Sequence, residues 1–305
     1  MTQVAPSGEQ ITIEHGDQQA VVVGVGAGLR VYTVRGRDLV NGYCVDEMAT
    51  AGRGQVLIPW PNRLQDGKYE FEGRGHQLPL TEPEHANAIH GLVRWSVWSV
   101  ADHEPERVVM THRLHPRPGY PFTLDLSIEY TLSDHGLSVR TTATNVGHDR
   151  CPYGCGAHPY LSVGTETVDA AVLQAPARTV LQADGRGIPT GATPVAGTDY
   201  DFREPRAIAA TRLDHGFTDL ERGEDGLARV ELTDPETEAA LALWVDESYP
   251  YLMLFTGDLP DIGRRGLAVE PMTCAPNAFR SGEGLIVLEA GGSVTSTWGI
   301  SPTAR

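Results

Sequence analysis

Short segments with the two-residue period of β-strands dominate this chain, and turn-forming residues bound each of them. The period is clearest in Leu137 to Thr144 and in much of Phe122 to Leu132, which are joined by Ser133-Asp134-His135-Gly136. The 34 glycines and 21 prolines are spread along the chain, so they end many short elements and do not mark one linker. Helical periodicity is hard to find. The sequence therefore predicts an all-β protein, a large antiparallel β-sandwich with few short helices.

Other segments carry the same signal. A Gly-Ala-Gly turn separates two candidate strands, 19–25 and 29–34, as in a hairpin. Further strands are expected at 95–100, 167–173, 227–232, 239–245, 251–255, 267–270 and 293–299. The most turn-rich stretch, 183–200, has no complete domain on either side, and no repeat is visible. One continuous domain over residues 1–305 is therefore expected.

The charge balance restricts the partners. Lys and Arg number 24 against 40 Asp and Glu, a net charge of -16, so the surface potential repels nucleic acid and anionic membranes. The first ten residues lack the basic and apolar regions of a secretion signal, and no run approaches the roughly 20 apolar residues of a membrane span. A cytoplasmic protein, either a monomer or a homodimer, is expected.

Three separated titratable residues stand among small or apolar neighbours: His90, His158 and Glu270. Gly91 allows another backbone or a ligand to approach His90, and Pro159 constrains the path beside His158. Glu270 ends an apolar run, where burial would raise its pKa toward that of a base working at neutral pH. Two histidines and a carboxylate can move protons in both directions near neutral pH, which is the equipment of a general acid–base enzyme. The alternative for each is a structural role in the core or in a loop.

Four more residues fit a sugar-binding role. The forked guanidinium group of Arg63 and the carboxylate of Asp214 are suited to bind neighbouring sugar hydroxyls. A buried ion pair would explain the presence of these two residues equally well. Trp60 and Tyr160 offer flat faces on which a sugar ring can stack, with a core role as the alternative for Trp60.

No cofactor signal accompanies these residues. The glycines of Gly24-Val25-Gly26-Ala27-Gly28 lie between strands with no helix to follow, so they do not form a phosphate-binding loop. Cys151 and Cys155 are a weak zinc signal without a second pair at metal-ligand spacing. We expect neither a nucleotide nor a metal.

From about Gly52 to Trp298 the chain resembles the aldose 1-epimerase, or mutarotase, family. The resemblance is carried by the order and spacing of motifs that are weak singly: Trp60-Pro61-Asn62-Arg63-Leu64, Gly67-Lys68-Tyr69, Phe71-Glu72-Gly73, Ala88-Ile89-His90-Gly91-Leu92, Ala157-His158-Pro159-Tyr160, Leu213-Asp214 with Phe217, Ala268-Val269-Glu270-Pro271 and Ala275-Pro276-Asn277-Ala278-Phe279.

This resemblance implies a β-sandwich that binds a free aldose, such as glucose, galactose or a related hexose, in a groove across one sheet. It implies that Glu270 is the base that takes the proton of the C1 hydroxyl and that His158 is the acid that protonates the ring oxygen. His90 would stabilise developing charge, and Arg63 and Asp214 would bind hydroxyls. No cofactor is implied.

The segment 80–87 departs from the family's galactose enzymes, which often carry an aromatic residue and an Asn–Glu pair there, so a different pocket rim is expected. A modified sugar such as a sulfosugar therefore stays open as a substrate. Three other functions also stay open: a non-catalytic carbohydrate-binding or sensor protein, a glycoside hydrolase that uses Asp214 and Glu270, and a metalloenzyme with two histidines and a carboxylate as ligands.

Overall fold

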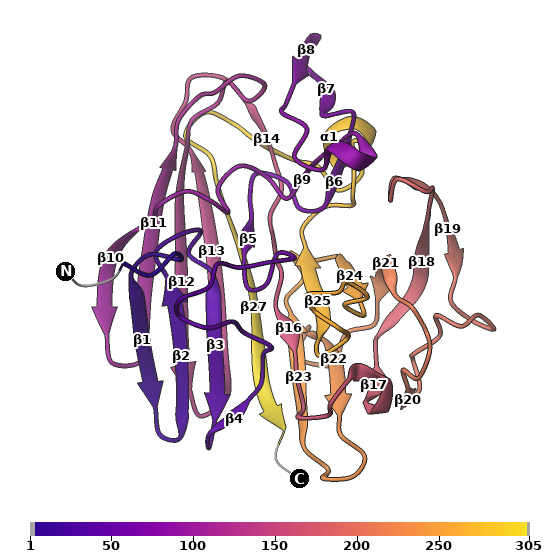
Figure 1. Ribbon diagram of the computed structural model, residues 1–305. Coiled ribbons are helices and arrows are strands. Elements are labelled where there is room, and N and C mark those ends of the chain that lie inside the picture. Colours follow the sequence, from indigo (N-terminus) through magenta and orange to yellow (C-terminus); the bar gives the residue numbers. More distant parts are fainter. Residues whose placement is uncertain (1–3, 304–305) are drawn as a thin grey trace.

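The computed structural model of the chain describes residues 4–303. Antiparallel sheets stack in layers, with the N-terminal strands lying against the strands that follow residue 98 (Figure 1). The helices in the described part are short: α1 (Ala278–Ser281) and the 3₁₀ turns η1 (Pro83–His85) and η2 (Val168–Ala170). The prediction of an antiparallel β-sandwich with few short helices is confirmed. None of the helices among residues 4–303 has both the length and the apolar character that crossing a bilayer demands.

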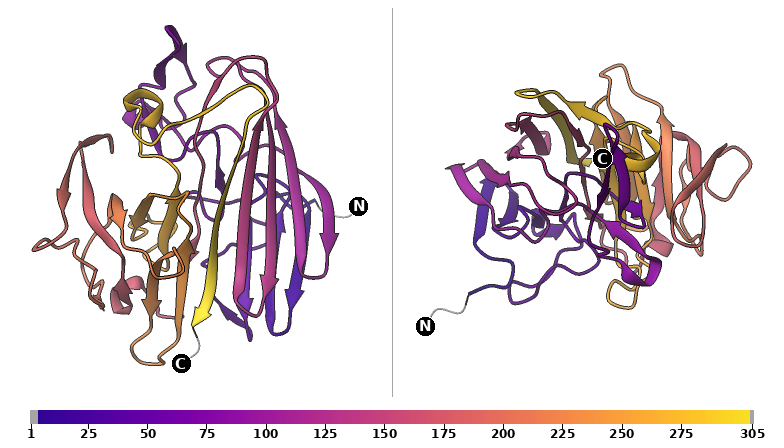
Figure 2. Two further views of the ribbon diagram at one scale, coloured as in Figure 1. Left: turned by 180° about the vertical axis from the view of Figure 1, so that it is seen from behind. Right: turned by 90° about the horizontal axis from the view of Figure 1, so that it is seen from above.

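The largest sheet has nine strands within the described residues. Their spatial order is β10 (Ser99–Glu104), β11 (Arg107–Leu114), β12 (Leu124–Ser133), β13 (Gly136–Asn145), β27 (Ser293–Thr303), β23 (Ala240–Val245), β22 (Ala228–Thr233), β17 (Val172–Gln174) and β20 (Arg206–Ala207). The C-terminal strand β27 thus joins the first half of the chain to the second, as the view from behind shows (Figure 2).

A second sheet contains the strand that carries Glu270. Its order is β19 (Pro189–Pro194), β18 (Ala177–Ala183), β21 (Asp214–Leu220), β24 (Tyr251–Phe255), β25 (Leu267–Met272), β15 (Gly156–Ala157) and β5 (Val56–Leu57), and β16 (Tyr160–Leu161) also pairs with β25.

Smaller sheets complete the structure. The N-terminal layer consists of β1 (Gln10–His15), β2 (Gln18–Val23), β3 (Leu29–Val34) and β4 (Arg37–Asp38). The two-stranded pairs are β6 (Arg63–Gln65) with β9 (Asn87–Ile89), β7 (Lys68–Phe71) with β8 (Arg74–Gln77), and β14 (Cys151–Tyr153) with β26 (Ile286–Leu288).

The main core lies between these layers, and the alternation in the sequence explains it. Along β12 every second side chain is buried, among them Leu126, Ile128 and Tyr130, because alternate residues of a strand face the same side. The buried Tyr130 hydroxyl donates to the carbonyl of Ala27 at 2.6 Å, which ties the large sheet to the N-terminal layer.

Two strand predictions were wrong in part. Within 95–100 the strand begins only at Ser99, because Ser96 and Trp98 hydrogen-bond with Gly26 and Gly24 of the N-terminal layer and pairing with β11 starts afterwards. Within 167–173 the chain first forms η2, since the Val168 amide donates to Arg264 of another loop, and β17 starts only at Val172.

Candidate active site

His90, His158 and Glu270 converge although they are far apart in the sequence. One potential ligand atom from each lies within 4.8 Å of those of the other two, and all three residues are buried, with 7%, 4% and 3% of their surface exposed. His90 follows β9, His158 connects β15 and β16, and Glu270 lies in β25, with which both β15 and β16 pair. The sheet pairing therefore places the imidazole of His158 beside the carboxyl group of Glu270.

The backbone around His90 is unusual, and it fixes the ring. His90 has a φ of 61°, in the left-handed region that residues other than glycine rarely adopt. Its amide donates to the Asn62 carbonyl at 3.0 Å, and its Nδ1 accepts the Asn62 amide at 3.2 Å. A neutral His90 ring consequently carries its proton on Nε2, which can serve as a donor in the site. At Gly91 a Cβ would lie 2.0 Å from the Ile58 carbonyl oxygen, so this position requires glycine.

Loop 50–55 and Tyr160 hold His158. Its amide donates to the Gln55 carbonyl at 3.1 Å, and its own carbonyl accepts the Gly54 amide at 2.9 Å. The Tyr160 ring stacks on the imidazole with 5.0 Å between centroids and 11° between planes. Gly52 passes so close that a Cβ there would lie 2.5 Å from Cδ2 of His158. The imidazole is thus confined on several sides.

Glu270 and His158 form the central contact. Oε1 of Glu270 lies 3.2 Å from Nε2 of His158, and Oε2 has no hydrogen-bond partner among residues 4–303. Burial raises the pKa of Glu270 well above its usual value, and the nearby Asp214 carboxylate adds to this. Burial lowers the pKa of His158 to about 3 and that of His90 well below 6.5. Although the spacing would suit an ion pair, burial favours the neutral form of both partners, a carboxylic acid beside a neutral imidazole.

Arg63, at the start of β6, lies next to this group and has two acidic neighbours. Its Nε is 3.1 and 3.0 Å from the two carboxylate oxygens of Glu82, and its Nη1 is 3.9 Å from Oδ2 of Asp214. The Arg63 and Glu82 side chains are largely buried, whereas the Asp214 side chain is 52% exposed. The ion pair that the sequence offered as an alternative thus forms chiefly with Glu82, and Asp214 stays accessible from the solvent.

Comparison with known proteins identifies the family of the chain. The family model described as aldose 1-epimerase matches residues 9–301. The chain belongs to the aldose 1-epimerase family. It is 38% identical over 292 residues to YihR of Escherichia coli K12, an uncharacterized protein, covering 95% of this chain and 92% of that one. It is 25% identical over 222 residues to the aldose 1-epimerase of the same organism, covering 70% of this chain and 62% of the relative.

A solved structure shares the fold. The GalM/aldose epimerase homologue from C. elegans superimposes with a TM-score of 0.86 at 20% identity, covering 97% of this chain and 99% of the other. The supersandwich architecture of the aldose 1-epimerase family therefore extends over nearly the whole chain.

Several residues near His90, His158 and Glu270 were not singled out from the sequence. Glu82 also accepts a hydrogen bond from Nδ2 of Asn87 at 2.9 Å, and Arg186 reaches the Asn87 side chain at 3.3 Å from the loop between β18 and β19. Burial acts against ionisation of Glu82, but the hydrogen bonds from Arg63 and Asn87 hold its pKa below the usual value. The departure from the family pattern in 80–87 was the available signal, since Glu82 and Asn87 both lie there.

Arg94 is a further residue that the sequence did not reveal. Its guanidinium lies over the Trp95 ring, 5.3 Å from the centroid, and has no hydrogen bond or ion pair within residues 4–303. After burial, its positive charge also contributes to the lowered pKa values of His90 and His158. Arg94 thus adds an unpaired positive charge to the electrostatics of both histidines.

The two aromatic candidates have protein partners. Trp60 is 3% exposed and packs against Phe279 with 5.5 Å between centroids, as in the core role that the sequence allowed. Tyr160 is 1% exposed, stacks on His158 and donates its hydroxyl to the Ala51 carbonyl at 3.0 Å. Sugar stacking by either residue stays a prediction.

The three central residues also have the composition of a metal site. Zinc and iron require an unprotonated imidazole nitrogen from each histidine. Nδ1 of His90 is already engaged with the Asn62 amide, so the neutral ring carries its proton on Nε2 and leaves neither nitrogen free for a metal. This donor set fits proton transfer better than metal binding.

Proposed function

We propose that the protein is an aldose 1-epimerase that interconverts the α and β anomers of a free hexose. One observation carries the proposal: two buried imidazoles and a buried carboxyl group lie within 4.8 Å of one another, in a chain that belongs to this family. Ring opening of a sugar needs one proton removed and another delivered, and these groups are suited to both tasks.

In the proposed reaction, Glu270 takes the proton of the C1 hydroxyl while His158 delivers a proton to the ring oxygen. The bond between C1 and the ring oxygen breaks, its electron pair goes to that oxygen, and C1 becomes the aldehyde carbon. After rotation about C1–C2, the C5 hydroxyl attacks the opposite carbonyl face. His158 then regains a proton and Glu270 returns one.

The preference of Glu270 and His158 for their neutral forms supports these roles. The closed sugar requires a carboxylate and an imidazolium, and ring opening converts them into a neutral acid and a neutral imidazole. Both sets contain the same number of protons, so no exchange with the solvent is needed. Burial favours the neutral set, which lowers the free energy of the opened state relative to the closed one.

The remaining residues have supporting roles in this proposal. Nε2–H of His90 can donate to an oxygen on which charge develops. Arg63, fixed by Glu82, and the accessible carboxylate of Asp214 offer donors and acceptors to the sugar hydroxyls.

A second substrate class is favoured by Arg94. A guanidinium without a protein partner suits an anionic substituent, so a modified hexose such as a sulfosugar is the alternative substrate of the same reaction. With this substrate, Arg94→Met would raise KM strongly and leave the exchange of neutral glucose almost unchanged.

An NMR anomer-exchange panel across glucose, galactose, xylose, arabinose and sulfoquinovose tests the proposal. The wild type should accelerate exchange for at least one sugar, and a folded Glu270→Gln variant should lose this acceleration. Calorimetric binding of sugar without faster exchange would instead identify a carbohydrate-binding protein. Release of reducing sugar from aryl glycosides would identify a hydrolase.

A further inference from the structure

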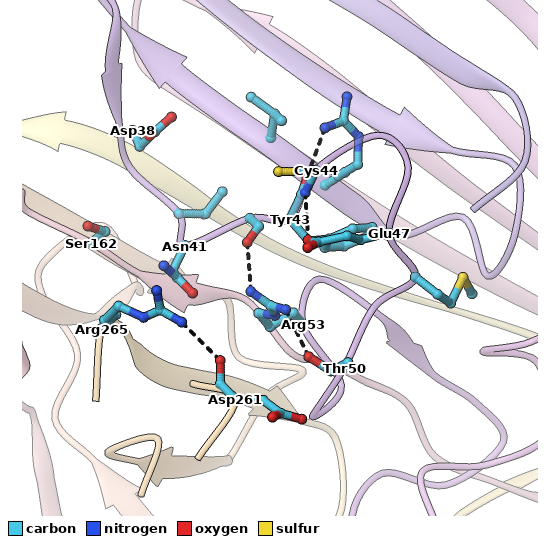
Figure 3. A pocket seen from close by; sticks show the side chains of 15 residues that line it. Asp38, Asn41, Tyr43, Cys44, Glu47, Thr50, Arg53, Ser162, Asp261 and Arg265 are labelled. Atoms are coloured by element: carbon cyan, nitrogen blue, oxygen red, sulfur yellow. Dashed lines mark hydrogen bonds between the residues drawn. The ribbon is translucent and has the colours of Figure 1, made fainter. Parts of the chain in front are cut away.

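A large polar hollow of about 910 Å³ lies beside the site but does not include His90, His158 or Glu270. It lies between the N-terminal layer and the loops that precede β5 and β25 (Figure 3). Its wall contains three arginines, three acidic residues, and amide and hydroxyl groups, including Asn41, Thr50 and Ser162. We call it the second hollow.

The charges of the second hollow are held apart. Arg30, Arg53 and Arg265 form no ion pair with any carboxylate in residues 4–303, although Asp38, Glu47 and Asp261 line the same hollow. Uncharged oxygens hold the arginines instead: Arg53 donates to the Gly42 carbonyl at 2.9 Å and to the Thr50 hydroxyl at 2.8 Å, and Arg265 donates to the Asp261 carbonyl at 3.0 Å (Figure 3). Arg30 donates to the side-chain oxygen of Gln10 at 2.7 Å and to the Tyr43 carbonyl at 3.0 Å.

This arrangement offers donors and acceptors together. Guanidinium groups only donate, carboxylates only accept, and their formal charges cancel. Two buried atoms of the wall, Asn41 Oδ1 and Arg53 Nε, also lack a partner, so the protein alone does not satisfy the wall. A neutral ligand rich in hydroxyl groups matches such a surface, because each hydroxyl both donates and accepts. A simple anion would leave the acceptors unpaired.

The second hollow and the catalytic residues share a wall. Thr50 and Arg53 line the hollow, while Gly52 between them contacts the edge of the His158 ring. The Asn41 amide donates to the Tyr160 carbonyl at 2.7 Å, and Tyr160 in turn stacks on His158. A ligand in the hollow would therefore lie one layer of residues away from the imidazole.

We infer that the second hollow is a carbohydrate-binding site distinct from the catalytic site, which takes a neutral mono- or disaccharide. The choice of a sugar among polyols rests on the proposed function, whereas the existence of the site does not. Its volume of about 910 Å³ leaves room for either size of sugar.

The test is a two-dimensional NMR titration of the Glu270→Gln variant with glucose, galactose and maltose. Amide signals of Asn41, Ser162 and Arg265 report on the hollow, and those of Gly91 and Ala157 report on the catalytic site. Two groups of signals that shift with different affinities are expected. Asn41→Leu or Arg265→Met should weaken the hollow affinity by at least about tenfold, because unpaired polar groups remain.

A matched control is Arg222→Met. Arg222, like Arg265, donates to backbone carbonyls and forms no ion pair within residues 4–303; its acceptors are Gly226, Val245 and Tyr249, and it lies outside the hollow. It should leave both affinities unchanged.

Three outcomes would overturn the inference: no shift of the hollow signals with any of the sugars, one binding event in which both groups move together, or unchanged hollow affinity in both folded variants. Failure of the proposed function would look different, since the wild type would then bind sugar in the hollow without accelerating anomer exchange.

Discussion

Replacing Gly52 by alanine tests whether the position of the His158 ring governs catalysis. The added Cβ would lie 2.5 Å from Cδ2 and 2.9 Å from Nε2 of His158, where ordinary contacts begin at 3.4 Å. The imidazole must therefore retreat by about 0.9 Å, and Nε2 is the atom that meets Glu270. A misplacement of about 1 Å can cost roughly 10²-fold in rate. We expect anomer exchange, measured by NMR at equilibrium, to slow by about that factor.

The same substitution also strains the backbone, because Gly52 has a φ of 76°. A left-handed alanine costs about 1–2 kcal/mol, so the melting temperature should fall by a few degrees. Gly36→Ala is the control, with a φ of 72° and nothing within 4 Å of its added Cβ. Both variants should lose stability through backbone strain, Gly52→Ala more because of its clash with the His158 ring, and only Gly52→Ala should lose rate. A folded Gly52→Ala variant with the wild-type rate would refute the reasoning.

Three further results are expected. Glu82→Gln should raise KM about tenfold with a smaller change in kcat, because Arg63 loses a charge-assisted hydrogen bond worth about 1.5–3 kcal/mol. Rates measured over a series of sugar concentrations would contradict this if KM and kcat changed by equal factors. The free energy of unfolding should fall as the pH drops from 6.5 toward 3, because His158 is protonated in the unfolded chain in that range but not in the folded protein. Urea titrations at several pH values should show that the unfolding free energy of His158→Gln depends less on pH. Glu270 has a raised pKa, so its stabilising contribution is present below pH 4.5 and is lost as the pH rises; Glu270→Gln should accordingly unfold at higher urea than the wild type at pH 8.

The sequence predicts individual strands well, but it does not predict which distant segments lie against one another. The strands of β12 and β13 follow from alternation, because burial of one sheet face imposes a two-residue period. The segment 95–100 misled because its partners, Gly24 and Gly26, are about seventy residues away and are recognised only once the layers are stacked.

The same distinction holds within the site. His90, His158 and Glu270 were identifiable because each is a titratable residue among small or apolar neighbours, which are unusual in an exposed loop. The anchoring of Arg63 by Glu82 and the contact of Arg186 with Asn87 were not, since 19 and 99 residues separate the partners and neither pair carries a local pattern. The sequence also did not show that position 52 requires glycine, because the ring that leaves no room for a Cβ there belongs to His158, more than a hundred positions later.

The proton chemistry of the site follows from the architecture that buries it. Strand pairing with β25 brings the backbone of His158 to Glu270, and the surrounding layers remove water from both. Either group alone would then simply become neutral and inert. Side by side at 3.2 Å, the two groups together keep the proton count that the proposed reaction requires, in which one group takes a proton while the other delivers one. The left-handed backbone of His90 and the close passage of Gly52 constrain the positions of the two rings, which strand pairing alone does not fix. The proposed proton transfer would depend on these constraints.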